Sequence, residues 1–151
     1  MAEVEVELVG LSLVSGDVDA TLDFYRLLGI PTPEENVWRT DSGAHHVTGV
    51  PVGSAAVAIE FDSHDLARVY NQGHREVPAP GGAIISFRVP TRDAVDELYR
   101  RLTDAGHPGR QPPFDAFWGA RYAIVADPDG RDVGVMSPRD PDHRSEDPPL
   151  L

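Results

Sequence analysis

Histidine and carboxylate groups are the side chains through which this chain could bind a metal or transfer a proton. It contains six histidines and 25 acidic residues but no cysteine, which excludes thiolate metal sites, disulfides and cysteine nucleophiles. His45 and His46 are adjacent, so only one of them can point to a given side of a strand. His46 together with Glu60 is a candidate metal-binding pair, although transition metals generally need about three such ligands.

Glu60 is open to two other roles. Strand alternation places it on the same side as Arg88, and a carboxylate–guanidinium pair there would rigidify the site. Alternatively, Glu60 contacts a hydrogen-bond donor of a ligand or acts as a general base. Ser12 and Ser86 lie beside these two residues on the same side of the predicted strands.

Three aromatic residues, Trp38, Trp118 and Tyr122, are candidates for the wall of a pocket. Their rings combine a flat apolar surface with a polar edge, which suits planar or heteroaromatic ligands. Packing in the core is an equally good interpretation of each one.

The elements that position these residues occur twice, with a shift of 74 residues. Between residues 10–28 and 84–102 six aligned pairs are identical, among them Ser12/Ser86 and Tyr25/Tyr99. In both copies an alternating apolar run leads into a stretch with helical spacing. A repeat of this length indicates a duplicated module, with a pocket expected where the copies face each other.

The first module is expected at residues 7–62 and the second at 83–136, with a linker over 71–82 that is rich in turn formers. Each should contain one helix, the first capped by Ser15 or Asp17 and ending at Gly29, the second capped by Thr91 and ending near Gly106. Strands are predicted at 9–13, 37–40, 45–50 and 55–61, and again at 83–89, 118–126 and 133–136. We expect the acidic, proline-rich residues 137–151 to be disordered.

Alternation along these strands separates two faces. One parity is wholly apolar and suits the side beneath the helices: Leu11, Leu13, Val57, Ile59, Phe61, Ile85, Phe87, Val89, Val133 and Val135. The other is mixed and contains several small residues, as the lining of a cavity would: Gly10, Ser12, Val14, Ala58, Glu60, Ile84, Ser86, Arg88, Asp132, Gly134 and Met136.

Charge and composition exclude some partners. The net charge of −12 argues against nucleic-acid binding, which needs clustered basic residues. No apolar segment approaches the roughly 18 residues of a membrane helix, and the acidic N-terminus does not resemble a signal peptide. We therefore expect a cytoplasmic protein.

The doubled βαβββ plan, the helix end FYRLLG at Phe24–Gly29 and the segment FWGARYAIVADPDG at Phe117–Gly130 together resemble the vicinal oxygen chelate superfamily. This group holds glyoxalase I, extradiol dioxygenases, fosfomycin-resistance enzymes and bleomycin-resistance proteins. The resemblance implies one α+β domain over residues 1–136, with a cupped mixed sheet, helices on its convex face, and a homodimer. Catalytic members hold a divalent metal with ligands from the first and last strands of each module, usually His and Glu, whereas the bleomycin-resistance type has none.

In this chain the four ligand positions implied by the resemblance fall on Gly10, Glu60, Ile84 and Gly134. Only Glu60 can bind a metal, so we expect neither metal nor other cofactor. The leading hypothesis is a binding module for a small aromatic or hydrophobic molecule, with Ser12, Trp38, Glu60, Ser86, Arg88, Trp118 and Tyr122 at its site. The alternatives are a metal-dependent lyase, isomerase or dioxygenase with an altered ligand set, and a cofactor-free enzyme that transfers a proton through Glu60 or a neighbour.

Overall fold

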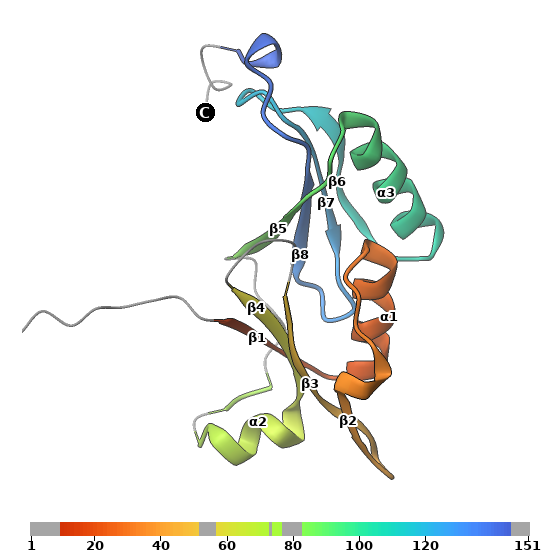
Figure 1. The fold of residues 1–151 in the computed structure, drawn as a ribbon, viewed down its shortest axis with the longest axis vertical. Helices are drawn as coiled ribbons and strands as arrows, with labels where there is room; N and C mark the ends of the chain where they lie inside the picture. Colours follow the sequence, from red (N-terminus) through yellow and green to blue (C-terminus); the bar gives the residue numbers. More distant parts are fainter. Residues whose placement is uncertain (1–9, 52–56, 73, 77–82, 146–151) are drawn as a thin grey trace, which may run out of the picture. The chain divides into compact units, whose positions relative to one another are not determined.

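A computed structural model describes residues 10–51, 57–72, 74–76 and 83–145 of the chain. They belong to two compact units, Met1–Glu76 and Val77–Leu151, which we call unit 1 and unit 2 (Figure 1). None of the helices in the described ranges is long and apolar enough to cross a membrane.

Unit 1 contains a four-stranded mixed sheet in the order β1-β4-β3-β2. Strands β1 and β4 are parallel, and the β4–β3 and β3–β2 pairs are antiparallel. Helix α1 follows β1, a 3-10 turn at Glu34–Asn36 precedes β2, and helix α2 follows β4. The bounds are β1 Gly10–Ser15, α1 Val18–Leu28, β2 Val37–Thr40, β3 Gly43–Pro51, β4 Ala58–Ser63 and α2 His64–Tyr70.

Unit 2 repeats this topology in a second four-stranded sheet, in the order β5-β8-β7-β6. Again the first and last strands are parallel neighbours and the other pairs are antiparallel. The bounds are β5 Ile84–Arg88, α3 Arg92–Asp104, β6 Gly109–Asp115, β7 Arg121–Ala126 and β8 Asp132–Met136. The prediction of an α+β chain made of two tandem βαβββ modules is confirmed.

The two long helices form where the sequence places their signals. Asp17 caps α1 by accepting a hydrogen bond from the backbone N–H of Ala20, and Gly29 ends the helix with a φ of 109°. Thr91 caps α3 in the same way, through the backbone N–H of Ala94. Both predicted stripes are buried: Val18, Leu22, Tyr25 and Leu28 in α1, and Val95, Leu98 and Leu102 in α3.

The predicted division of the sheet faces is largely correct. Ile59, Phe61, Val133 and Val135 are at most 4% exposed, because α1 packs on β3 and β4 while α3 packs on the strands of unit 2. Leu11 differs, since it is 38% exposed at the start of edge strand β1. In the other parity set Gly134 is buried, because the side chain of Tyr122 lies against it.

Apart from shifts of a few residues at strand ends, three segments differ from the predictions. No strand was predicted at β6, which contains Pro112 and Pro113; these residues lack a backbone N–H, and an edge strand tolerates them. Helix α2 was not expected in the segment before the linker. Residues 137–145, which we expected to be disordered, contain a 3-10 turn at Pro141–His143, and Arg144 forms a β-bridge with Trp118.

Candidate functional site

Unit 1 contains a pocket of about 480 Å³ on the face of its sheet that turns away from α1. Strand alternation explains this position, because Ile59 and Phe61 point into the core and the neighbouring β4 residues Glu60 and Asp62 therefore point to the other side. Helix α2 adds the remaining wall. The lining residues are Ser12, Trp38, His46, Glu60, Asp62, Leu66 and Tyr70.

Asp62 organises the base of this pocket. It is 3% exposed, and both of its carboxylate oxygens are occupied. His46 Nδ1 lies 2.6 Å from Oδ1, and the Tyr70 hydroxyl donates to Oδ2 at 2.8 Å. One carboxylate thus joins strand β3, strand β4 and helix α2, and it fixes the orientation of two side chains that line the pocket.

The Tyr70 hydroxyl keeps its proton and acts as a hydrogen-bond donor. Tyr70 as a whole is 58% exposed, but its hydroxyl end sits against buried Asp62. Burial of that end, the hydrogen bond to Asp62 and the negative charges of Asp62 and Glu60 raise the pKa of Tyr70 to about 12. The phenol therefore stays protonated throughout the neutral pH range.

Glu60 faces the pocket beside Ser12, its register partner on β1. The Ser12 hydroxyl donates to Glu60 Oε2 at 3.4 Å, a long contact on an exposed surface. The predicted partner Arg88 belongs to unit 2, so the Glu60–Arg88 pair remains a prediction. Within the described part of unit 1 no arginine forms an ion pair with Glu60.

Trp38 forms the outer wall of the pocket from edge strand β2, with 53% of its surface exposed. Its ring lies 5.3 Å from that of His45, centroid to centroid. Trp38 thus lines a pocket of unit 1, and its contact with a ligand remains a prediction.

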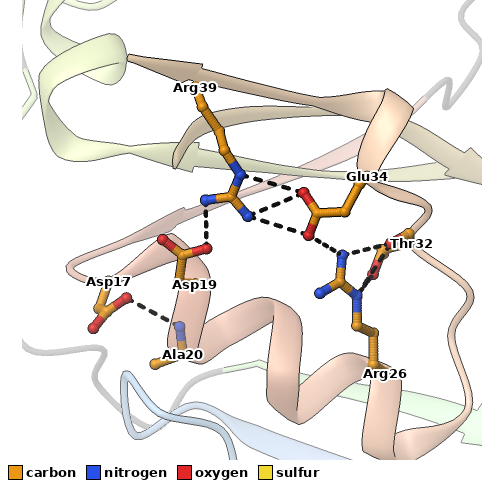
Figure 2. Close-up of polar contacts among 7 residues, drawn as sticks. All are labelled: Asp17, Asp19, Ala20, Arg26, Thr32, Glu34 and Arg39. Carbon is orange, nitrogen blue, oxygen red and sulfur yellow. Dashed lines mark hydrogen bonds and ion pairs between the residues drawn. The ribbon is translucent and has the colours of Figure 1, made fainter. Parts of the chain in front are cut away.

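The neighbouring Arg39 fastens β2 to α1 (Figure 2). Its guanidinium bonds Asp19 Oδ1 at 2.6 Å and Glu34 Oε2 at 3.2 Å, and Arg26 reaches Glu34 Oε1 at 3.1 Å. Hydrogen bonds from Arg26 and then Arg39 lower the pKa of Glu34. This network spans the 3-10 turn and holds the strand that carries Trp38.

Three of the four predicted site residues of unit 2 lie together in an aromatic cluster. The Tyr122 hydroxyl lies 3.3 Å from Ser86 Oγ, and the Tyr122 ring packs edge-on against Trp118 and Phe114 with centroids 5.4 and 6.2 Å away. Arg88 is exposed on β5. The structure thus joins Ser86, Trp118 and Tyr122 in one group, and it joins Ser12, Trp38 and Glu60 in another.

Gly134 is one of the small residues assigned to the cavity-lining parity, but the space above it is already occupied. A Cβ atom at this position would lie 2.6 Å from the Tyr122 hydroxyl oxygen and 2.9 Å from Tyr122 Cε2, closer than side chains tolerate. Gly134 therefore allows Tyr122 to lie flat on β8, and it does not leave volume for a ligand.

Replacing Gly134 with leucine should consequently destabilise unit 2, by about 1–3 kcal/mol, because Tyr122 must leave its cluster. Urea denaturation measures the loss. In a Tyr122→Ala background the same replacement should cost much less, since the obstructing ring is gone and only the small hydroxyl of Ser86, the other close neighbour, must shift. Additive losses in the double variant would contradict this interpretation.

Asp62, Leu66 and Tyr70 were not among the predicted site residues. Asp62 continues the parity of Glu60 along β4, and Ser63 caps α2 through the backbone N–H of Leu66. Both signals were present in the sequence, the first as simple alternation and the second as a serine before a helical stretch.

The donor groups of the pocket do not fit a metal ion. Among the residues that the structure describes, no three His, Asp or Glu side chains gather so that they could hold one. His46 and Glu60, the pair considered for a metal, do share the pocket, but Asp62 binds His46 and Tyr70 with its two oxygens.

Comparisons with known proteins agree with this fold. The sequence profile of the Glyoxalase/Bleomycin resistance protein/Dioxygenase superfamily matches residues 7–135. No curated protein matches the chain.

Solved structures resemble the chain at low sequence identity. A glyoxalase/bleomycin resistance protein/dioxygenase family enzyme from Burkholderia phytofirmans PsJN is 20% identical with a TM-score of 0.71, covering 87% of this chain and 98% of that one. A glyoxalase-related enzyme from Fulvimarina pelagi is 21% identical with a TM-score of 0.69, covering 87% and 88%. A glyoxalase/bleomycin resistance protein/dioxygenase from Nocardioides is 19% identical with a TM-score of 0.65, covering 99% and 91%.

Proposed function

The chain belongs to the glyoxalase/bleomycin resistance protein/dioxygenase superfamily, and on that basis we propose that it binds a small aromatic or hydrophobic molecule without a metal. The binding site is the pocket of unit 1. The family suggests that such binding serves to sequester the molecule or to confer resistance to it.

The exposed indole of Trp38 is the observation that carries the proposal. A large aromatic side chain that is 53% exposed at the rim of a pocket of about 480 Å³ presents a flat apolar surface to a ligand. Leu66 and Tyr70 add apolar area from α2, while His46, Glu60 and Ser12 supply convergent polar atoms. Apolar walls with a few fixed polar groups are typical of small-molecule sites.

The same lining favours binding over catalysis. Proton abstraction leaves negative charge on the substrate, which enzymes stabilise with positive groups or convergent donors. The lining residues include two carboxylates and no lysine or arginine. A metal could supply that charge, but the donor set described above does not fit one.

We also propose that the protein is a homodimer in solution, as the family resemblance implies. A monomeric mass by light scattering at micromolar concentration would contradict this part of the proposal.

The binding proposal predicts that Trp38→Ala weakens the affinity for 2-naphthylethanol about 10-fold or more, because an aromatic wall of the pocket is lost. The Trp118→Phe variant lacks the other tryptophan, so Trp38 is its only indole. Ligand contact with Trp38 can then be followed by fluorescence. Titrations before and after chelator treatment should agree. Binding that requires added Zn²⁺, or that ignores Trp38→Ala, would contradict the proposal.

A further inference from the structure

The two units carry equivalent positions on their pocket-side faces, and they differ there in chemistry. In the strand register Ser12 pairs with Glu60 and Ser86 pairs with Gly134, so Glu60 and Gly134 correspond. His46 pairs with Asp62, whereas Tyr122 pairs with Met136. Trp38 pairs with His46, whereas Phe114 pairs with Tyr122.

The serines and the aromatic outer walls are alike in the two units. At the other three positions unit 1 has an ionisable side chain, whereas unit 2 has none that ionises near neutral pH. Glycine and methionine replace the two carboxylates, and tyrosine replaces the histidine. In unit 2 the corresponding space is filled by Tyr122 itself. The negative charge is therefore a property of the pocket in unit 1 and not a requirement of the shared fold.

Acceptor atoms are prominent among the polar groups that remain available in this pocket. His46 directs Nδ1 at Asp62, which leaves Nε2 as its second ring nitrogen. Glu60 presents its carboxylate, which within the described part of unit 1 accepts the long hydrogen bond from Ser12. The Tyr70 hydroxyl already donates its hydrogen to Asp62.

The walls suit a positive charge as well. Trp38 and Tyr70 are aromatic and more than half exposed, and the faces of such rings attract cations. A hollow lined by one sign of charge also concentrates ions of the opposite sign. The net charge of −12 adds to this field at long range.

We propose that the ligand of this pocket is an organic cation: a protonated amine attached to an aromatic body, with the ammonium at Glu60 and the aromatic part against Trp38. This inference rests on the proposed binding function and specifies its ligand class. Glu60 would be the residue that determines specificity for charge, while Asp62 positions His46 and Tyr70.

Three probes that share one aromatic body test the proposal: 2-(2-naphthyl)ethylammonium, 2-naphthylethanol and 2-naphthylacetate, titrated at neutral pH by calorimetry. The ammonium should bind about 10-fold tighter than the alcohol, because a charge-assisted hydrogen bond replaces a neutral one, and the acetate should bind most weakly. Raising the salt concentration should shrink the preference for the ammonium, since part of it is Coulombic.

Glu60→Gln keeps the shape of the side chain and should bring the ammonium and alcohol affinities to within about twofold of each other, with the alcohol unchanged. Asp23→Asn is the matched control: it makes the same change in charge at an exposed position on α1, away from the pocket, and should preserve the preference.

The outcomes separate the two proposals. Equal binding of ammonium and alcohol to the unmodified protein, or a preference that survives Glu60→Gln, would overturn the assignment of a cationic ligand and leave aromatic binding intact. Failure of all three probes to bind would overturn the binding function, and the inference with it.

Discussion

Replacing Phe87 with aspartate is expected to unfold unit 2, whereas the same replacement at the adjacent Ser86 should be tolerated far better. Phe87 is 9% exposed and pairs in register with fully buried Val135, while Ser86 is exposed on the opposite face of β5. Loss of a buried phenylalanine side chain costs about 3–5 kcal/mol, and an unpaired buried carboxylate adds several more. The sum is comparable to the whole stability of a domain, about 5–15 kcal/mol.

Circular dichroism and urea denaturation of both variants measure this difference. Phe87→Leu serves as a control, because it keeps an apolar side chain in the same place and should remain folded. Equal damage from Phe87→Asp and Ser86→Asp would mean that the assignment of the two faces of β5 is wrong.

Asp62→Asn is the second replacement with a large expected effect, a loss of about 2–4 kcal/mol in the free energy of unfolding. The side chain is buried, and the amide cannot match the charge-assisted bonds that its carboxylate accepts from His46 and Tyr70. The amide nitrogen would also face one of these partners in place of an acceptor oxygen. Urea denaturation of the variant measures the loss.

Tyr70→Phe is the matched comparison, since it removes only the second of these bonds and should cost about 1 kcal/mol. The double variant Asp62→Asn, Tyr70→Phe should be less destabilised than the sum of the single variants, because both changes remove the same contact. Strict additivity would show that the Tyr70–Asp62 bond does not form in solution.

The helices and the apolar face could be predicted because single physical rules fix them. Burial at intervals of three and four residues marks α1 and α3, and side-chain alternation marks the strands. The repeat added information that neither copy carries alone: the first-strand alignment that pairs Ser12 with Ser86 also aligns Glu60 with Gly134, as the strand registers show.

There are specific reasons why two elements, β6 and α2, were not predicted. Pro112 and Pro113 of β6 are atypical of a strand, and whether a strand tolerates proline depends on its place at the edge of the sheet and not on its own residues. The short helix α2 has only seven residues, of which Ala67 alone is buried, so its hydrophobic period is weak. The site residues of α2 and the role of Asp62 were not predicted either, because they depend on tertiary contacts between β3, β4 and α2.

The same pair of prolines has a consequence for how unit 2 avoids unwanted association. An open sheet edge is a template for aggregation, because a foreign strand can bond to its unpaired backbone groups. On β6 two successive residues have no amide hydrogen to offer, and the register with β7 is irregular on both sides of Gln111. Replacing both prolines with valine, a strong strand former, would therefore create a continuous edge, at the risk of fibril growth that the native sequence suppresses.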